Sequence, residues 1–328
     1  MTEALIDYGL FLAKTLTLLL GIGLLLALAV RARKSGLHQD DHLEVTNLNE
    51  RFRDLAHALR RASTRKKDFE RSLKAEQKAD KLKEKATGCR NRLFVIDFQG
   101  DIKATESAAL REIITGILME AKDGDQVLIR LENAGGLVTE HGLAASQLTR
   151  LRARGLHLTA AVDKVAASGG YLMAVVADRI IAAPFAVVGS IGVVAQLPNF
   201  HRVLERHGVD YELHTAGDYK RTLTLFGENT EAGRDKLRQQ LEDTHRLFKD
   251  FIHEYRPGLD LGQVATGEYW HGHQALALGL IDEIKTSDDF LLEAAATCDL
   301  YKVSYSAHKK PIERLLASLT GTAARRLL

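Results

Sequence analysis

The sequence predicts an α/β fold, because short apolar segments alternate with segments of helical spacing over residues 91–300. The strand-like segments are rich in Val, Ile and Leu and are bounded by glycine or polar turns. The helical segments place apolar residues three and four positions apart. Such alternation is typical of a mostly parallel sheet, in which strand-to-helix junctions gather functional groups at one edge.

The predicted elements follow one another at short intervals. The strands are Leu93–Phe98, Gln126–Leu131, Leu156–Val162, Ile180–Ala183, Ala186–Val194 and Tyr211–His214. The helices are 106–121, Leu143–Leu151, Ser168–Ala177, Phe200–Arg206 and 230–255. Glycines end several of these elements, and Pro257-Gly258 ends the last helix, which Asn229 or Thr230 can cap.

An apolar run near the N-terminus predicts a membrane anchor. Residues 8–30 contain a single charge, Lys14, and as a helix would span about 34 Å, close to the thickness of a bilayer core. Acidic residues precede the run, and Arg31, Arg33 and Lys34 follow it. A cleaved signal peptide would show the opposite order, so we expect a retained single-pass helix in contact with the lipid bilayer.

The segment after this run is unusually charged. Residues 37–87 contain no Gly or Pro, and 14 of the 21 residues in 65–85 are charged. This pattern predicts a solvated helix or weak coiled coil outside the core. Both a stalk, which could promote oligomerisation, and a partly disordered linker remain open. The expected domains are a membrane anchor (1–35), a charged linker (36–90), a catalytic domain (91–300) and a C-terminal tail (301–328).

Charge and cysteine content exclude some classes of function. The net charge is +2, and the positive charge is concentrated in residues 31–88 rather than spread over a groove, which argues against nucleic-acid binding. Cys89 and Cys298 are too few for a disulfide framework or a structural zinc site. We expect two unpaired thiols, although spacing alone cannot establish whether they pair.

Two strand-to-helix junctions carry candidate catalytic groups. Glu132-Asn133-Ala134-Gly135-Gly136 follows a predicted strand, and its glycine N–H groups could stabilise a negative oxygen. Ser168 precedes Gly169-Gly170 at the start of a predicted helix, a position that favours a nucleophile and its oxyanion. An ordinary turn and a plain N-cap serine remain the alternatives.

A serine nucleophile needs a base. None of the thirteen histidines lies in a context that resembles a catalytic one; those considered are His201, His207, His245, His253, His271 and His273. A lysine whose pKa is lowered by burial is the other choice. Lys220 is the candidate, because it follows a predicted strand in the loop Gly217-Asp218-Tyr219-Lys220; a surface lysine is the alternative.

These motifs, taken in order, resemble a known family. They are Ala167-Ser168-Gly169-Gly170-Tyr171, Val188-Gly189-Ser190-Ile191-Gly192-Val193, Gly217-Asp218-Tyr219-Lys220, and Gly267-Glu268-Tyr269-Trp270 with Ala275-Leu276-Ala277-Leu278-Gly279-Leu280-Ile281-Asp282. The chain is similar to the signal peptide peptidase A family of serine proteases, in its SohB-like branch. The resemblance extends over nearly the whole chain.

The resemblance implies a fold and a set of roles. The fold would be a ClpP/crotonase-like spiral of β-β-α units. Ser168 would be the nucleophile, Lys220 the base and Ser190 the residue that orients the lysine amine. Gly135 or Gly136, with Gly169, would form the oxyanion hole.

The resemblance also implies reaction partners. No metal or cofactor would be needed, and the substrates would be peptides, including signal-peptide remnants. The base can come from a neighbouring subunit in this family, so a homo-oligomer is expected. Ala134 stands where relatives usually carry proline, which puts the rigidity of that loop in doubt.

Location and alternative functions stay open at this point. The positive-inside rule puts residues 31–328 in the cytoplasm, whereas the resemblance implies work on the outer side of the inner membrane. A non-catalytic membrane scaffold and an acyl-CoA hydratase or isomerase are the alternative functions. The second would need acidic catalytic residues and a CoA pocket.

Overall fold

The computed structural model describes residues 8–23, 42–86 and 90–306. The chain divides into two compact units, residues 1–42 with 305–328 and residues 43–304. In the first unit, residues 8–23 form a helix. None of the described helices is both long enough and apolar enough to cross a membrane. Residues 24–30 of the predicted anchor and residues 307–328 of the predicted tail lie outside the described residues.

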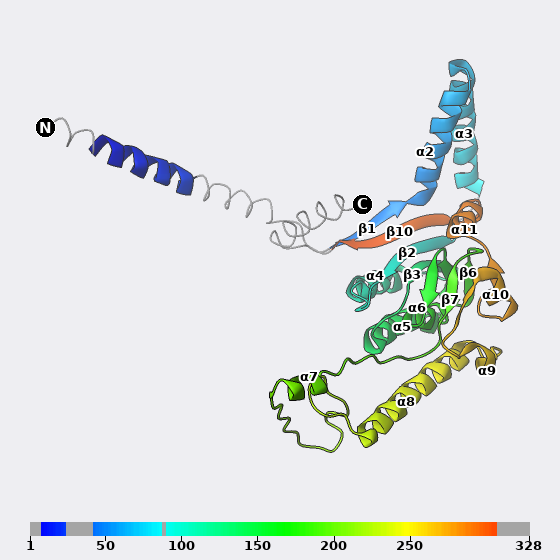
Figure 1. Cartoon of the computed structure of the whole chain (residues 1–328). Coiled ribbons are helices and arrows are strands. Elements are labelled where there is room, and N and C mark those ends of the chain that lie inside the picture. Colours follow the sequence, from blue (N-terminus) through cyan, green and yellow to red (C-terminus); the bar gives the residue numbers. More distant parts are fainter. Residues whose placement is uncertain (1–7, 24–41, 87–89, 307–328) are drawn as a thin grey trace. The chain divides into compact units, whose positions relative to one another are not determined.

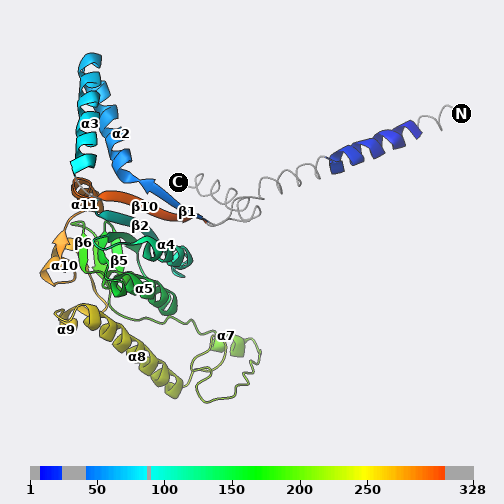
Figure 2. The same cartoon turned by 180° about the vertical axis from the view of Figure 1, so that it is seen from behind.

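A ten-stranded sheet organises the described residues from 42 onward (Figures 1 and 2). Its main path runs through β1 (His42–Asn47), β10 (Asp299–Ser306), β2 (Arg92–Gly100), β3 (Gln126–Asn133), β4 (His157–Val162), β6 (Arg179–Ala182) and β9 (Glu283–Ile284). From β10 to β9 each neighbouring pair is parallel. The α/β class predicted from the alternating pattern is therefore confirmed.

The sheet forks at β3. The first five residues of β3, Gln126–Arg130, pair with β4, whereas its last residue, Asn133, pairs with Ala166 of β5 (Val165–Ala167). A side branch then continues through β7 (Val187–Gly189), which is parallel to β5, and β8 (Tyr269–His271), which is antiparallel to β7. The fork brings the carboxyl ends of β3, β5 and β7 side by side.

Strands β2, β3 and β4 form the centre of the core. Most of their residues are buried, including Val95, Ile129 and Ala160. Parallel strands covered on both faces read as continuous apolar runs, which explains why sequence analysis located them. On the sheet, α4 (Ser107–Glu120) packs against α5 (Val138–Ala153), and α5 packs against α6 (Gly169–Ala174).

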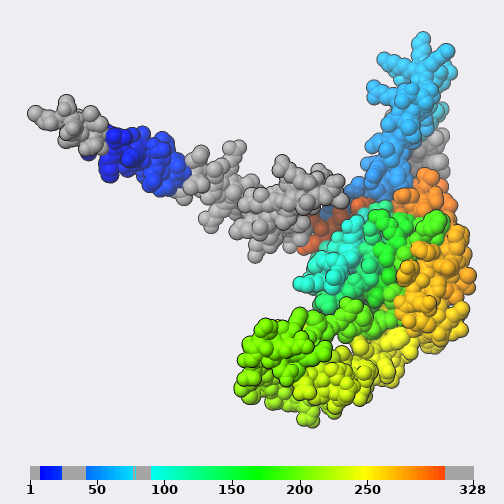
Figure 3. All heavy atoms as spheres, in the orientation of Figure 1, coloured from blue at the N-terminus to red at the C-terminus, as the bar shows by residue number. Residues whose placement is uncertain are grey.

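The charged segment forms a helical hairpin of α2 (Leu48–Ser63) and α3 (Lys66–Ala86), drawn in light blue in Figure 3. His57 Nε2 lies 3.0 Å from Glu76 Oε2, and Arg60 Nη1 donates to the same oxygen at 3.0 Å. The hairpin projects from the sheet and most of its described side chains are exposed, as a solvated helical segment should be.

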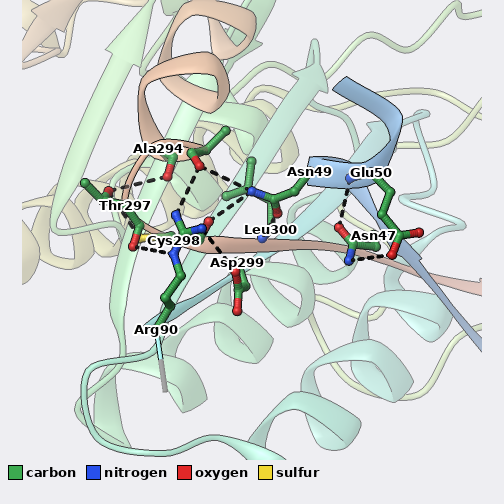
Figure 4. Close-up of polar contacts among 10 residues, drawn as sticks. Asn47, Asn49, Glu50, Arg90, Ala294, Thr297, Cys298, Asp299 and Leu300 are labelled. Atoms are coloured by element: carbon green, nitrogen blue, oxygen red, sulfur yellow. Dashed lines mark hydrogen bonds and ion pairs between the residues drawn. The ribbon is translucent and has the colours of Figure 1, made fainter. Parts of the chain in front are cut away.

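The base of the hairpin corrects the prediction that this segment lies outside the core. β1 joins the sheet, and Leu48 is only 4% exposed in a cluster with Leu93, Leu291 and Leu300. Asn49 Nδ2 donates to the carbonyls of Ala295 (3.3 Å) and Cys298 (3.1 Å), and its Oδ1 accepts from Leu300 N–H at 2.6 Å (Figure 4). Apolar residues are sparse in the hairpin, but buried Leu48 and the three hydrogen bonds of Asn49, which we call the clamp, fix its base to the sheet.

Between residues 194 and 306 the described chain adds five helices and an extended segment. The helices are α7 (His201–Arg206), α8 (Glu231–Tyr255), α9 (Leu261–Val264), α10 (Gly272–Ala277) and α11 (Ser287–Ala294). Residues 194–230, which we call the arm, lead from the sheet to α8 and include α7. The arm and α8 extend away from the sheet (Figures 1 and 3).

Two predicted strands differ from those observed. Tyr211–His214 is not a strand; it lies in the exposed arm, where no strand is present to pair with it. The predicted strand Ala186–Val194 is reduced to β7, because the chain leaves the sheet at Ser190, whose φ is 51°. At the C-terminus, residues 301–306, which sequence analysis assigned to the tail, belong to β10.

Candidate active site

Ser168 occupies a strained turn between β5 and α6. Its φ of 52° and ψ of −118° are rare for a residue with a side chain. The Ser168 N–H donates to the carbonyl of Gly189 on the neighbouring strand at 2.7 Å, which fixes the turn. The Ser168 hydroxyl makes no hydrogen bond within the described residues and caps no helix N–H. The plain N-cap alternative therefore does not describe this serine.

Ser190 directly follows β7, in register with Ser168, which directly follows β5. Ala167 pairs with Gly189, so the next residue of each strand is a serine at the same edge of the sheet. Neighbouring strands are separated by about 4.8 Å. The Ser190 N–H donates to the Glu268 carbonyl at 2.6 Å, and this bond holds its positive φ. The structure thus brings these two predicted site residues together.

The glycine loop after β3 lies directly against this turn. A Cβ built on Gly135, whose φ is 89°, would lie 2.7 Å from Ser168 Cβ and 2.8 Å from Gly169 N. Gly135 N–H already donates to Asn133 Oδ1 at 2.8 Å. Gly136 N–H and Gly169 N–H donate to no oxygen among the described residues. Gly136 and Gly169 therefore keep amides that are free to bind an oxyanion.

The later motifs pack around the turn at Ser168. Tyr171 is fully buried, and its hydroxyl donates to the Leu280 carbonyl at 3.0 Å. Burial raises the pKa of Tyr171 far above its ordinary value, so the phenol remains a hydrogen-bond donor. A Cβ on Gly189 would lie 2.8 Å from the ring of Trp270. Motifs that are far apart in sequence thus form one rigid support for Ser168.

Lys220 is not brought to Ser168 within one chain. It lies in the arm, and its exposed side chain makes no polar contact with any described residue. The turn around it is ordered: Lys220 N–H donates to the Gly217 carbonyl at 3.1 Å, and Lys236 Nζ lies 4.9 Å above the ring of Tyr219. A base must lie within hydrogen-bond reach of its nucleophile, so a single chain in this conformation does not form the predicted dyad.

Sequence analysis missed two polar residues beneath the site. Asn133 and His141 are both fully buried, and His141 Nε2 lies 3.1 Å from Asn133 Oδ1. The available signal was the placement of His141 in the first turn of the helix that follows the glycine loop. Of the two cysteines, Cys298 is a buried free thiol, and Cys89 lies outside the described residues, so their pairing remains untested.

Two family models and several curated relatives identify the family of this chain. Residues 3–148 match the model of the peptidase family S49 N-terminal region, and residues 150–301 match the model of peptidase family S49. The chain is 46% identical to a probable protease SohB of Haemophilus influenzae, over 96% of this chain and 92% of the relative. It is 53% identical to a probable protease SohB of Buchnera aphidicola from Acyrthosiphon pisum, over 73% of this chain and 71% of the relative.

Solved structures give a more distant likeness. A mutant of the 1510-N membrane-bound stomatin-specific protease in complex with a substrate peptide has a TM-score of 0.41 and 13% identity, over 71% of this chain and 99% of that chain. The two family models together cover most of the sequence, and so does each of the two relatives named above. The chain therefore belongs to peptidase family S49, and it is a peptidase.

Proposed function

We propose that this protein is a membrane-anchored serine endopeptidase that hydrolyses peptide bonds with a Ser168–Lys220 dyad. Ser168 is the nucleophile, Lys220 is the general base, and Ser190 orients the lysine amine. The amides of Gly136 and Gly169 hold the oxyanion, since the Gly135 amide is already bonded to Asn133. Lys220 then protonates the leaving amine, and water hydrolyses the acyl-enzyme.

The conformation of Ser168 is the observation that carries this proposal. A serine with positive φ at the start of a helix, with its hydroxyl unbonded, the free Gly169 amide next to it and the glycine loop packed against it at Gly135, matches the needs of acyl transfer. A structural serine would gain nothing from this strain. The curated relatives are proteases, which does not favour the scaffold or acyl-CoA alternatives.

The dyad requires that Lys220, which lies on the arm, be buried by another part of the assembly. A lysine acts as a base at neutral pH when burial lowers its pKa, whereas Lys220 is exposed in the single chain. The arm also exposes many apolar side chains: Val194, Leu197, Phe200, Val203, Val209, Tyr211, Leu213, Tyr219, Leu225 and Phe226. A contact between copies would bury these residues and Lys220 together. The proposal therefore includes a homo-oligomer.

The remaining parts of the proposal concern fold, domains and location. The forked sheet is taken as one turn of a ClpP/crotonase-like spiral, with the catalytic domain at 91–300. Residues 8–30 are taken as a single-pass anchor in the inner membrane, and signal-peptide remnants or other membrane-associated peptides as substrates. Reporter fusions at residue 90 would identify the side of the membrane on which the catalytic domain lies.

The test compares variants of the full chain in peptide cleavage and in labelling by a fluorophosphonate. We expect Ser168→Ala to abolish both, and Lys220→Ala to lower both by about 1,000-fold or more, as for other catalytic nucleophile and base pairs. Lys74→Ala is the matched control, because Lys74 is an exposed lysine on α3. Full activity in either Ser168→Ala or Lys220→Ala would refute the dyad.

A further inference from the structure

Asn133 and His141 form a buried polar pair that the proposed mechanism does not use. Both side chains are 0% exposed. His141 Nε2 lies 3.1 Å from Asn133 Oδ1, and His141 Nδ1 lies 3.0 Å from the Leu137 carbonyl oxygen. Burying polar groups is costly unless each finds a partner, so a pair at this depth needs a reason.

The same Asn133 oxygen holds the glycine loop. Oδ1 accepts the Gly135 N–H at 2.8 Å as well as facing His141. Because the amide of Gly135 is a donor, this contact identifies the Oδ1 atom. His141 donates to it in the tautomer whose ring hydrogen is on Nε2; in the other tautomer the hydrogen is on Nδ1 and faces the Leu137 carbonyl. The loop is also held at Leu137, whose N–H donates to the Ile102 carbonyl at 2.8 Å.

The pair also lies directly beneath the nucleophile turn. A Cβ on Gly169 would lie 2.5 Å from His141 Cγ, and a Cβ on Gly170 would lie 2.1 Å from the Asn133 carbonyl oxygen. On the other side, a Cβ on Gly100 would lie 2.2 Å from Asn133 Cγ. Both glycines after Ser168 are therefore required in order to admit these two residues.

We propose that His141 is a positioning residue for the oxyanion hole. Its Nε2–H fixes the Asn133 amide, and Asn133 turns the Gly135 amide inward so that the next amide, that of Gly136, faces the oxyanion beside Gly169. The inference rests on the proposed function, because it assumes a tetrahedral intermediate on Ser168. It also explains how the loop stays rigid with alanine rather than proline at position 134.

The geometry suggests a matched pair of substitutions. In His141→Gln, the side-chain amide nitrogen can take the place of Nε2 and still donate to Asn133. In His141→Asn, the shorter amide takes the place of Nδ1 and cannot reach Asn133. His253→Gln is the control, because His253 is exposed on α8. All variants are made in the full chain.

The experiment measures kcat and KM for a peptide substrate and the inhibition constant of a peptide aldehyde. The aldehyde forms a tetrahedral adduct with the serine, whose oxygen occupies the oxyanion hole. We expect His141→Asn to lower kcat by about 10- to 100-fold with KM within about 3-fold, and to weaken the aldehyde by a similar factor. We expect His141→Gln to recover kcat to within about 5-fold of wild type.

Other outcomes would overturn the inference. It fails if His141→Asn matches His253→Gln in kcat, or if aldehyde affinity survives in His141→Asn, or if His141→Gln is as impaired as His141→Asn. The inhibition constant and KM do not depend on the folded fraction of a preparation, so partial misfolding does not obscure the result. Wild-type protein that fluorophosphonate fails to label at Ser168 would refute the proposed function itself, and the positioning role with it.

Discussion

At the residue scale, two serines hold backbone conformations that local sequence does not explain. Ser168 and Ser190 have φ values of 52° and 51°, and each is fixed by an N–H bond to a carbonyl on another segment. Strain of this kind persists only where surrounding contacts determine it fully. The Ser168→Ala variant should therefore keep the turn, and its loss of activity should report the missing hydroxyl alone.

Gly169 should tolerate no side chain. In Gly169→Ala, the new methyl group would lie 2.5 Å from His141 Cγ within a packed core. We expect the free energy of unfolding to fall by about 1–3 kcal/mol, and activity to fall with it, because overpacking must displace the ring or the turn. Gly142→Ala on α5 meets no atom within 4 Å and should stabilise the helix by up to about 1 kcal/mol. Denaturant titration measures both; equal stability of the two variants would contradict the packing described here.

Asp125 should contribute stability that acid removes. Burial raises the pKa of Asp125, but hydrogen bonds from Arg92 and from the Lys122 and Arg92 backbones outweigh it and hold the pKa below its ordinary value. A carboxyl with a depressed pKa in the folded state stabilises the protein above its unfolded pKa of about 4, and this stability is lost as the pH falls through the folded value. We expect Asp125→Asn to lower Tm at pH 7 and to flatten the fall of Tm below about pH 4. If Tm falls below pH 4 as steeply in Asp125→Asn as in wild type, Asp125 does not make this contribution.

At the scale of elements, the hairpin of α2 and α3 depends on its base. Leu48 enters the core, and Asn49 joins the first turn of α2 to the end of α11 and the start of β10 by three hydrogen bonds (Figure 4). Further along, the two helices meet through the His57 and Arg60 contacts to Glu76. These partly buried contacts join the two helices to each other and not to the sheet, so the base carries the attachment to the sheet.

Removing the clamp should loosen the hairpin without unfolding the sheet. We expect Asn49→Ala to cost about 1–3 kcal/mol, because three partly buried backbone groups each lose a hydrogen bond, and of these only the Ala295 carbonyl keeps a side-chain donor, Arg90. Hydrogen exchange should then increase in α2 and α3 and remain slow in β2 and β3. Asn47→Ala serves as the comparison, because it removes only exposed bonds to Glu50, the N-cap bond among them, and should cost about 1 kcal/mol. Equal effects of the two variants would argue against the clamp.

At the scale of the whole molecule, the arm separates the two halves of the proposed dyad. Ser168 lies at the sheet edge within a network of buried residues, whereas Lys220 lies in the exposed arm. A heterologous contact between copies, repeated around a ring, would place the arm of one copy over the sheet edge of the next. This arrangement would complete every site by the same contact.

Mixing inactive variants tests this arrangement. If the base acts between copies, Ser168→Ala and Lys220→Ala, each inactive alone, should regain activity when co-assembled, with about one quarter of the sites complete in an equal random mixture. The Ser168→Ala variant mixed with the doubly substituted chain is the control and should stay inactive. A mixture that gains no activity, although mixed assemblies form, would mean that Lys220 serves Ser168 of its own chain.

The sequence by itself determined the α/β class, the central strands β2, β3 and β4, the strand-to-helix junctions and the candidate residues at them. These features can be predicted from short stretches of sequence, because buried parallel strands are continuous apolar runs and tight junctions need glycine. The family resemblance identified the peptidase activity for the same reason, because its motifs are short and contiguous.

Only the tertiary structure decided the rest. It set Ser168 beside Ser190 through the fork at β3, buried His141 against Asn133, and clamped the charged hairpin through Asn49. It also left Tyr211–His214 without a partner strand. Each of these outcomes depends on contacts between residues distant in sequence, and the periodicity of a single segment carries no information about which distant segment will pair with it.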